Sequence, residues 1–379
     1  MCMSVIELTQ KLIACASVTP KDEGAQVLLK DFLENLGFEC HCLEFGEGGE
    51  AVPNLFARLG TDGPHLCYAG HTDVVPAGDD DAWTYGAFTP HIQDGVLYGR
   101  GSSDMKGSVA AFASAVAQFV KSGVFKGSIS MLITGDEEGP SINGTVRVLE
   151  WMKENGHVPD VALVGEPTNP DHLGQEIKIG RRGSLSGSIT VSGKQGHVAY
   201  QHLAENPLPA LVKLLDALAN HRFDEGNAFF PPTNLEITTI DVGNQAENVI
   251  PASGKAVFNV RFNDKWSKNT LSEAIKRILD AVGNEYELEL WGNAESFMTE
   301  PGHWTEVVRD AVGDVVDAVP AYTTNGGTSD ARFITNYCPV VECGAINASI
   351  HQVDENARVE DLENLEKIYV RILERYFNV

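Results

Sequence analysis

The chain has 379 residues, 43% of them hydrophobic, and a formal net charge of −25 from 28 basic and 53 acidic side chains. This length is sufficient for two domains with buried cores, and the acidic balance argues against a nucleic-acid surface, which needs a local excess of Lys and Arg. The opening stretch MCMSVIELTQKLIACASV has no basic n-region, and no segment approaches about 18 uninterrupted apolar residues. We therefore expect a cytoplasmic chain that does not span a membrane.

Helices and buried strands alternate in the first half of the chain. Apolar residues at helical spacing predict helices at 3–16 and 23–37, and a further helix at Ser108–Lys121. Short apolar runs that end in polar turns predict buried strands at 65–69, 129–134 and 161–164. This alternation predicts an α/β fold in which helices cover both faces of a mostly parallel, mixed sheet.

The pattern changes after about residue 180. The order strand, helix, strand, strand, helix, strand predicts a ferredoxin-like βαββαβ unit, with elements at 184–192, 207–221, 235–242, 255–263, 268–282 and 286–291. The α/β pattern then resumes, with a strand near 339–343 and a final helix from about 360 to 376. We expect a discontinuous domain, 1–179 and 293–379, interrupted by an inserted domain at 180–292.

The cysteines do not form a recognisable metal or disulfide pattern. They are odd in number and scattered, without paired CxxC spacing. We expect reduced, mostly structural thiols. The set is Cys2, Cys15, Cys40, Cys42, Cys67, Cys338 and Cys343.

Polar residues follow the predicted strands at the edge where α/β sheets place ligands. His71 and Asp73 share one face of an extended chain, so the carboxylate can orient the imidazole of a metal-binding histidine. Asp104 lies in the turn GRGSSDMKG before a helix. A phosphate-binding loop is an alternative for this turn, but its spacing is neither GxGxxG nor GxxxxGK[ST].

Acidic residues end the strand SISMLIT. Adjacent acids such as Glu137 and Glu138 are costly to hold together without a cation, although a solvated turn is the alternative for such a cluster. Glu166 follows the next buried strand, and His351 follows a later one. Two imidazoles and three carboxylates suit a pair of Zn²⁺ ions. Glu137 is left beside the ligand Glu138 as the natural general base.

Other hydrolytic mechanisms have weaker support. A serine nucleophile lacks its usual GxSxG turn, and no cysteine lies near the histidines of these motifs.

The segments AGHTDVVP, GRGSSDMKG, TGDEEGP, VGEPT and IHQVDE occur in the order found in the family of two-zinc aminoacylases, carboxypeptidases and deacylases, which the whole chain resembles. The resemblance implies that Asp104 bridges the metals and that a cis peptide follows it. It further implies that His71 and Glu166 complete one metal site, and that Glu138 and His351 complete the other. Glu137 would be the base, and Asp73 would orient His71.

Within that family, the stretches IGRRGSLSGSITVSGKQGHVAY, ENVIPASGKAVFNVRF and NGGTSDARF resemble the desuccinylases. This implies hydrolysis of N-succinyl-LL-2,6-diaminoheptanedioate, in lysine and diaminopimelate biosynthesis, by a homodimer. His197 of the inserted dimerisation domain would reach the partner's active site and stabilise the oxyanion. The implied substrate contacts are Arg181, Asn248, Arg261, Gly327, Thr328 and Ser329.

Three alternatives stay open. The chain could be another deacylase of the family, such as an acetylornithine deacetylase, or a dipeptidase. It could also be a non-catalytic metal-binding protein, which the free acid Glu137 argues against. Co²⁺ or Mn²⁺ could replace Zn²⁺ at one site, because the same ligand types bind all three ions.

Overall fold

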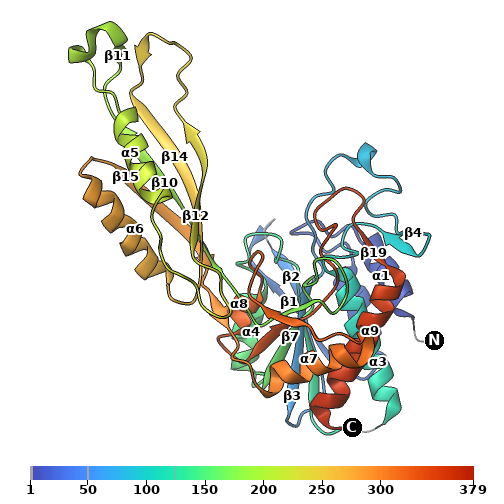
Figure 1. Cartoon of the computed structure of the whole chain (residues 1–379). Coiled ribbons are helices and arrows are strands. Elements are labelled where there is room, and N and C mark those ends of the chain that lie inside the picture. Colours follow the sequence, from blue (N-terminus) through green and yellow to red (C-terminus); the bar gives the residue numbers. More distant parts are fainter. Residues whose placement is uncertain (1–2, 49–50, 124) are drawn as a thin grey trace. The chain divides into compact units, whose positions relative to one another are not determined.

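The structure is a computed structural model that describes residues 3–48, 51–123 and 125–379. The chain divides into two compact units (Figure 1). The larger unit contains the described residues up to Ile179, together with Thr299–Thr323 and Ser329–Val379. The smaller unit contains Gly180–Met298 and also Thr324–Thr328. Residues 293–298 and 324–328 were expected in the discontinuous domain, so these two short segments differ from the predicted boundaries.

A mixed sheet of eight strands forms the centre of the larger unit. Its strands, in spatial order, are β1 (Glu39–Phe45), β2 (Val52–Leu59), β6 (Ser128–Thr134), β3 (His65–His71), β7 (Val161–Val164), β18 (Val340–Glu342), β8 (Glu176–Lys178) and β17 (Ala321–Thr323). The four central strands β6, β3, β7 and β18 run parallel to one another. Their carboxyl ends therefore lie along one edge of the sheet, as predicted.

Helices cover both faces of this sheet, which confirms the predicted fold class. One face packs against α1 (Val5–Ala14), α2 (Ala25–Glu34), α3 (Lys106–Ser122), α7 (His303–Val316) and α9 (Val359–Phe377). On that face the ring of Tyr68 stacks on Phe112 with centroids 4.2 Å apart. The opposite face packs against α4 (Thr145–Glu154) and α8 (Ala331–Ile334), where Phe56 contacts Trp151 with centroids 5.6 Å apart.

Several elements of the larger unit were not predicted. They include the antiparallel strands β1 and β2, the strands β8 and β17, helices α4, α7 and α8, and a small sheet of β4 (His91–Gln93), β5 (Val96–Tyr98) and β19 (Asn356–Arg358). β1 carries side chains that are only partly buried, so it lacks the apolar run that marks the central strands.

The smaller unit has the predicted ferredoxin-like order. Its elements are β10 (Gly183–Ser192), α5 (Leu208–Ala219), β12 (Asn234–Asp241), β14 (Ser253–Phe262), α6 (Lys268–Val282) and β15 (Glu287–Ala294). The antiparallel sheet has the order β12, β14, β10, β15. Apolar side chains of α5 and α6, such as Leu214 and Ile275, form a separate core with Phe258. Two short ribbons complete the unit: β11 (Gly196–His197) with β13 (Val249–Ile250), and β9 (Gly180–Arg181) with β16 (Phe297–Met298).

The described cysteines are free thiols, and none of the described helices is both long and apolar enough to cross a bilayer. Burial raises the pKa of Cys67 to about 11, so this thiol is unreactive at neutral pH. The prediction for Cys2 falls outside the described residues.

Candidate metal centre and active site

His71 ends β3 with its imidazole fully buried. Its Nδ1 donates a hydrogen bond to the main-chain oxygen of Asp73 at 2.9 Å, because a carbonyl can only accept. In the neutral form of the imidazole, the lone pair therefore lies on Nε2. This atom lies 3.3 Å from Oδ1 of Asp104 and 3.7 Å from Oε1 of Glu166, without a hydrogen-bond partner among the described residues. This is the orientation that a metal ligand requires.

The carboxylate of Asp73 has a different set of partners from the one expected. Its Oδ1 lies 3.6 Å from Nδ1 of His71, farther than the main-chain oxygen of the same residue. The carboxylate accepts hydrogen bonds from Thr19 Oγ1 at 2.7 Å and from the main-chain N–H groups of Glu138 and Glu137 at 3.0 and 3.3 Å. Asp73 therefore holds His71 through its main-chain oxygen and the turn after β6 through its carboxylate. The carboxylate is buried and needs such donors.

Asp104 lies between the two histidines. It follows β5 in the turn before α3, and the peptide bond between Asp104 and Met105 is cis, as the family resemblance implies. Its Oδ1 faces Nε2 of His71 at 3.3 Å, and its Oδ2 faces Nε2 of His351 at 3.4 Å. A carboxylate that presents each oxygen to a different imidazole has the geometry of a bridging ligand.

The remaining carboxylates come from the ends of neighbouring parallel strands. Glu138 follows β6 and lies 2.9 Å from Nε2 of His351, whereas Glu166 follows β7 and lies beside His71. His351 is in the loop between β18 and β19, with a positive φ of 61° and an exposed side chain. The structure thus brings together all five residues that the sequence analysis expects to bind metal.

The electrostatics of this cluster require positive charge. Hydrogen bonds with Asp104 and Glu138 raise the pKa of His351 to about 10. Burial, together with the nearby carboxylate of Glu166, raises the pKa of Glu137 well above its usual value. Burial alone would lower the pKa of His71, but the carboxylate of Asp104, 3.3 Å from Nε2, and the other surrounding carboxylates raise it. The clustered carboxylates thus favour positive charge among them, which cations can supply.

The donor set fits metal ions. Two ligands at the usual Zn–N and Zn–O distances of a tetrahedral ion lie about 3.3 Å apart, close to the separations of Asp104 from both histidines. Ligand atoms of His71, Asp104 and Glu138 lie within 4.8 Å of one another, and so do those of His71, Glu137 and Glu166. The second group includes Glu137, so distance alone does not separate the expected base from the expected ligands.

The smaller unit contains most of the predicted substrate contacts. Arg181 is buried, and its Nη1 donates to the main-chain oxygen of Gly327 at 3.2 Å. Thr328 belongs to the same unit, whereas Ser329 belongs to the larger one. The Ser329 side chain is fully buried, and its Oγ donates to Oε1 of Glu342 at 2.5 Å. A substrate contact at Ser329 would therefore have to use its main chain.

His197 and Asn248 lie on the same short ribbon of the smaller unit. His197 pairs with Val249 across β11 and β13, and the main-chain oxygen of Asn248 accepts from Val198 N at 3.0 Å. Nδ1 of His197 accepts from the main-chain N–H of Ala199 at 3.1 Å. A neutral His197 therefore carries its proton on Nε2, which makes the exposed imidazole a hydrogen-bond donor.

Arg261 on β14 is a half-buried cation with no hydrogen bond or ion pair to a described residue. Its charge adds to burial in lowering the pKa of the neighbouring Arg182, whose Nη1 donates to Asn234 Oδ1 at 2.9 Å. Sequence reasoning missed Arg182, although its adjacency to Arg181 was a signal. It also missed Glu355, which lies four residues after His351 and is fully buried.

Comparisons with known proteins identify the family of the chain. The family described as peptidase family M20/M25/M40 matches residues 67–375. The succinyl-diaminopimelate desuccinylase of Rhodospirillum centenum is 54% identical over 374 residues, covering 98% of this chain and 97% of the relative. That of Xanthobacter autotrophicus is 51% identical over 372 residues, covering 98% and 99%.

Solved structures share the fold at low sequence identity. The M20 family metallo-carboxypeptidase Sso-CP2 of Sulfolobus solfataricus has a TM-score of 0.80 at 16% identity, with both chains covered completely. The Bacillus subtilis YXEP protein, described as a dinuclear metal-binding peptidase, has a TM-score of 0.73 at 15% identity, covering 99% and 98% of the two chains. Since the family match spans most of the chain and relatives at about half identity span nearly all of it, the chain belongs to peptidase family M20/M25/M40.

Proposed function

We propose that this chain is a metal-dependent amide hydrolase that converts N-succinyl-LL-2,6-diaminoheptanedioate and water to succinate and LL-2,6-diaminoheptanedioate. The reaction belongs to lysine and diaminopimelate biosynthesis, and we place it in the cytoplasm. The observation that carries the proposal is the identity of about one half, over both units, to relatives named succinyl-diaminopimelate desuccinylase. The low-identity solved structures support the fold alone.

The cluster at the carboxyl ends of β3, β6 and β7 would hold two Zn²⁺ ions, with Co²⁺ or Mn²⁺ as alternatives at one site. His71 and Glu166 would bind one ion, Glu138 and His351 the other, and Asp104 both. The buried Nε2 of His71 and Oδ1 of Asp104, neither with a hydrogen-bond partner among the described residues, support this assignment. When bound, the metal ions would polarise the amide carbonyl and make a bound water more acidic.

Protons move through the side chain of Glu137. As a carboxylate it would take a proton from the attacking water, and it would then deliver that proton to the nitrogen of the leaving amine. Partial burial of Glu137 would strengthen its interaction with developing charge. His197 would donate from Nε2 to the oxyanion, because its Nδ1 is already occupied as an acceptor.

Arginines of the smaller unit would select the substrate by its carboxylates. The substrate is a polyanion and the protein has a net charge of −25, so local cations must overcome the overall field. Arg261 is suited to this because its guanidinium is half-buried and pairs with no acid in the described part of the chain. Arg181, Asn248, Gly327, Thr328 and the main chain of Ser329 would complete the contacts.

Hydrolysis rates for three substrate classes test the proposal. With metal loaded, we expect kcat/KM for N-succinyl-LL-2,6-diaminoheptanedioate to exceed that for N-acetylornithine or a dipeptide by about 100-fold or more, because neither competitor offers the succinyl carboxylate. A preference for the acetylated or peptide substrate would transfer the assignment to another member of the family. Absence of metal-dependent turnover with every substrate would favour a binding protein.

Replacement of Arg261 tests the substrate contact. Arg261→Ala should lower kcat/KM for the succinylated substrate by about 10- to 100-fold, the loss expected for a charge-assisted hydrogen bond of about 1.5 to 3 kcal/mol. Metal content should not change. Arg277→Ala is the matched control, because Arg277 is an exposed arginine of the same unit on α6. Equal kcat/KM values for the two variants would remove Arg261 from the substrate site.

The proposal includes a homodimer formed through the smaller unit. β12 is an edge strand of the sheet, and an unpaired edge can accept a strand of a second copy. Exposed apolar side chains lie on this strand and on the helix beside it, with Ile240 58% exposed and Val212 64% exposed. Pairing of two copies would cover both.

A further inference from the structure

The carboxylate of Glu355 is fully buried and holds the turn that carries Asp104. Its Oε1 accepts three main-chain hydrogen bonds, from Gly101 at 3.1 Å and from Ser103 and Asp104 at 3.0 Å each. Its Oε2 accepts from Nη1 of Arg100 at 2.8 Å. One side chain thus satisfies three N–H groups of this turn and a buried guanidinium.

Arg100 extends this connection to the segment after β3. Its Nη2 donates to the main-chain oxygen of Pro76 at 3.3 Å, and its guanidinium lies over the ring of Trp83, 5.1 Å from the centroid. The guanidinium is also buried, so Glu355 is its only anionic partner among the described residues. A charge in this position needs that partner.

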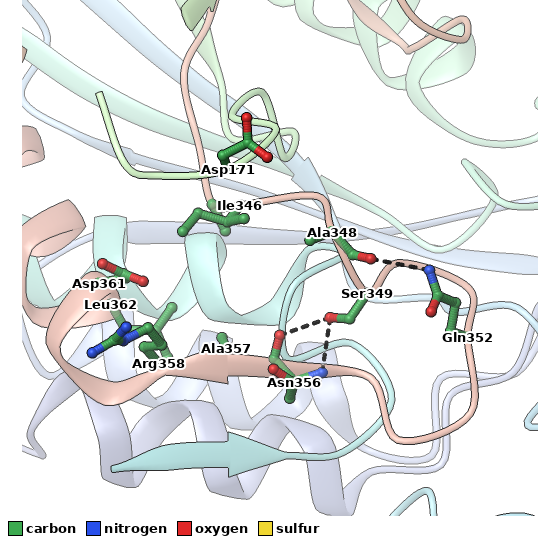
Figure 2. Close-up of a pocket in the computed structure, with 11 residues that line it drawn as sticks. Asp171, Ile346, Ala348, Ser349, Gln352, Asn356, Ala357, Arg358, Asp361 and Leu362 are labelled. Atoms are coloured by element: carbon green, nitrogen blue, oxygen red, sulfur yellow. Dashed lines mark hydrogen bonds between the residues drawn. The ribbon is translucent and has the colours of Figure 1, made fainter. Parts of the chain in front are cut away.

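Glu355 belongs to the same loop as His351. The loop is closed on itself: Oγ of Ser349 hydrogen bonds with the main-chain O and N of Asn356 at 2.9 and 3.0 Å, and Nε2 of Gln352 donates to Ala348 O at 3.0 Å (Figure 2). The main-chain oxygen of Glu355 also accepts from Gly99 N at 2.9 Å. His351 itself has the left-handed φ of 61°, which a non-glycine residue keeps only when its surroundings hold it.

Two loops that are far apart in sequence must therefore meet with the right spacing. Asp104 presents Oδ1 to His71 and Oδ2 to His351 at nearly equal distances of 3.3 and 3.4 Å. A shift of the Asp104 turn relative to the His351 loop would lengthen one distance and shorten the other. The hydrogen bonds of Glu355 join these two loops directly, through the main-chain N–H of Asp104 itself.

We infer that Glu355 is a positioning residue for metal binding: it holds the Asp104 turn against the His351 loop so that both oxygens of Asp104 face their imidazoles. This inference rests on the metal site proposed above. Glu355 is not itself a proposed metal ligand, because its carboxylate oxygens accept hydrogen bonds from the Asp104 turn and from Arg100. Its loss should weaken metal binding before it affects substrate binding.

The test measures zinc affinity in the full-length protein. In Glu355→Gln the amide can still accept from the turn, but its NH₂ group faces the donors of Arg100. We expect the zinc dissociation constant, measured by chelator competition, to rise by about 10- to 100-fold, as for other groups that orient metal ligands. The zinc concentration for half-maximal activity should rise in parallel, excess zinc should restore most of kcat, and KM should stay close to the wild-type value.

Glu366→Gln is the matched control. Glu366 lies on α9 and accepts hydrogen bonds from Ser114 and Gln118 of α3, so its replacement removes a similar charge without touching the metal-bearing turns. It should leave zinc affinity unchanged even if Tm falls. Glu355→Asp keeps the charge but is one methylene shorter, and an intermediate zinc affinity is expected; it decides the question if Glu355→Gln does not fold.

Wild-type zinc affinity in folded Glu355→Gln or Glu355→Asp, with only a lower Tm as in the control, would overturn the inference and leave the proposed metal site intact. Failure of the wild-type protein itself to bind zinc would instead overturn the metal site, and the inference with it.

Discussion

Glu137→Gln should lower kcat by about 100-fold or more without loss of metal, because it removes a general base and leaves the ligands in place. The neutral amide cannot take a proton from water, and it is nearly isosteric with the carboxylate. Metal content is the deciding measurement, because Glu137 lies close enough to His71 and Glu166 to be a ligand itself. Metal analysis beside steady-state kinetics separates the two roles.

The pattern of loss identifies which carboxylate is the base. Glu138→Gln serves as the matched variant, since Glu138 is the adjacent carboxylate and contacts His351 at 2.9 Å. It should lose metal as well as activity. If Glu137→Gln loses zinc and Glu138→Gln keeps it, the roles assigned to the two residues are reversed.

A mixed dimer of Glu137→Gln with His197→Ala should recover about one quarter of wild-type activity from two nearly inactive parents. His197 lies on the exposed ribbon of the smaller unit and would serve the partner's active site. In the mixed dimer, the intact His197 of the Glu137→Gln subunit would act on the subunit that retains Glu137. Random re-association of equal amounts makes half the dimers mixed, and each has one complete site out of two.

The experiment requires exchange of subunits by co-expression or reversible dissociation, verified with two different tags. If His197 acted within its own chain, every site of the mixed dimer would lack one essential group. Activity no greater than the parents' average in verified mixed dimers would therefore eliminate the role in trans. A chain that stays monomeric at assay concentrations would eliminate the homodimer as well.

Much of the candidate metal centre was predictable from local sequence patterns. Short apolar runs placed buried strands directly before His71, the Glu137–Glu138 pair and Glu166, and parallel strands must end at the same edge of a sheet. The structure confirms that these side chains meet, with Asp104 and His351, at ligand distances. The ferredoxin-like order was also predictable, because the spacing of apolar residues distinguishes its helices from its strands.

The tertiary structure alone decided which atoms pair. Sequence placed Asp73 near His71, but the folded chain uses the main-chain oxygen of Asp73 for the imidazole and its carboxylate for the turn after β6. Likewise, the buried side chain of Ser329 and the hydrogen bonds that the Asp104 turn donates to Glu355 depend on segments far apart in the chain. The spacing of apolar residues in the sequence indicates which face of a helix or strand a residue occupies. The partner of a buried polar atom depends instead on tertiary packing, which can bring a donor or acceptor from a distant part of the chain within hydrogen-bond distance.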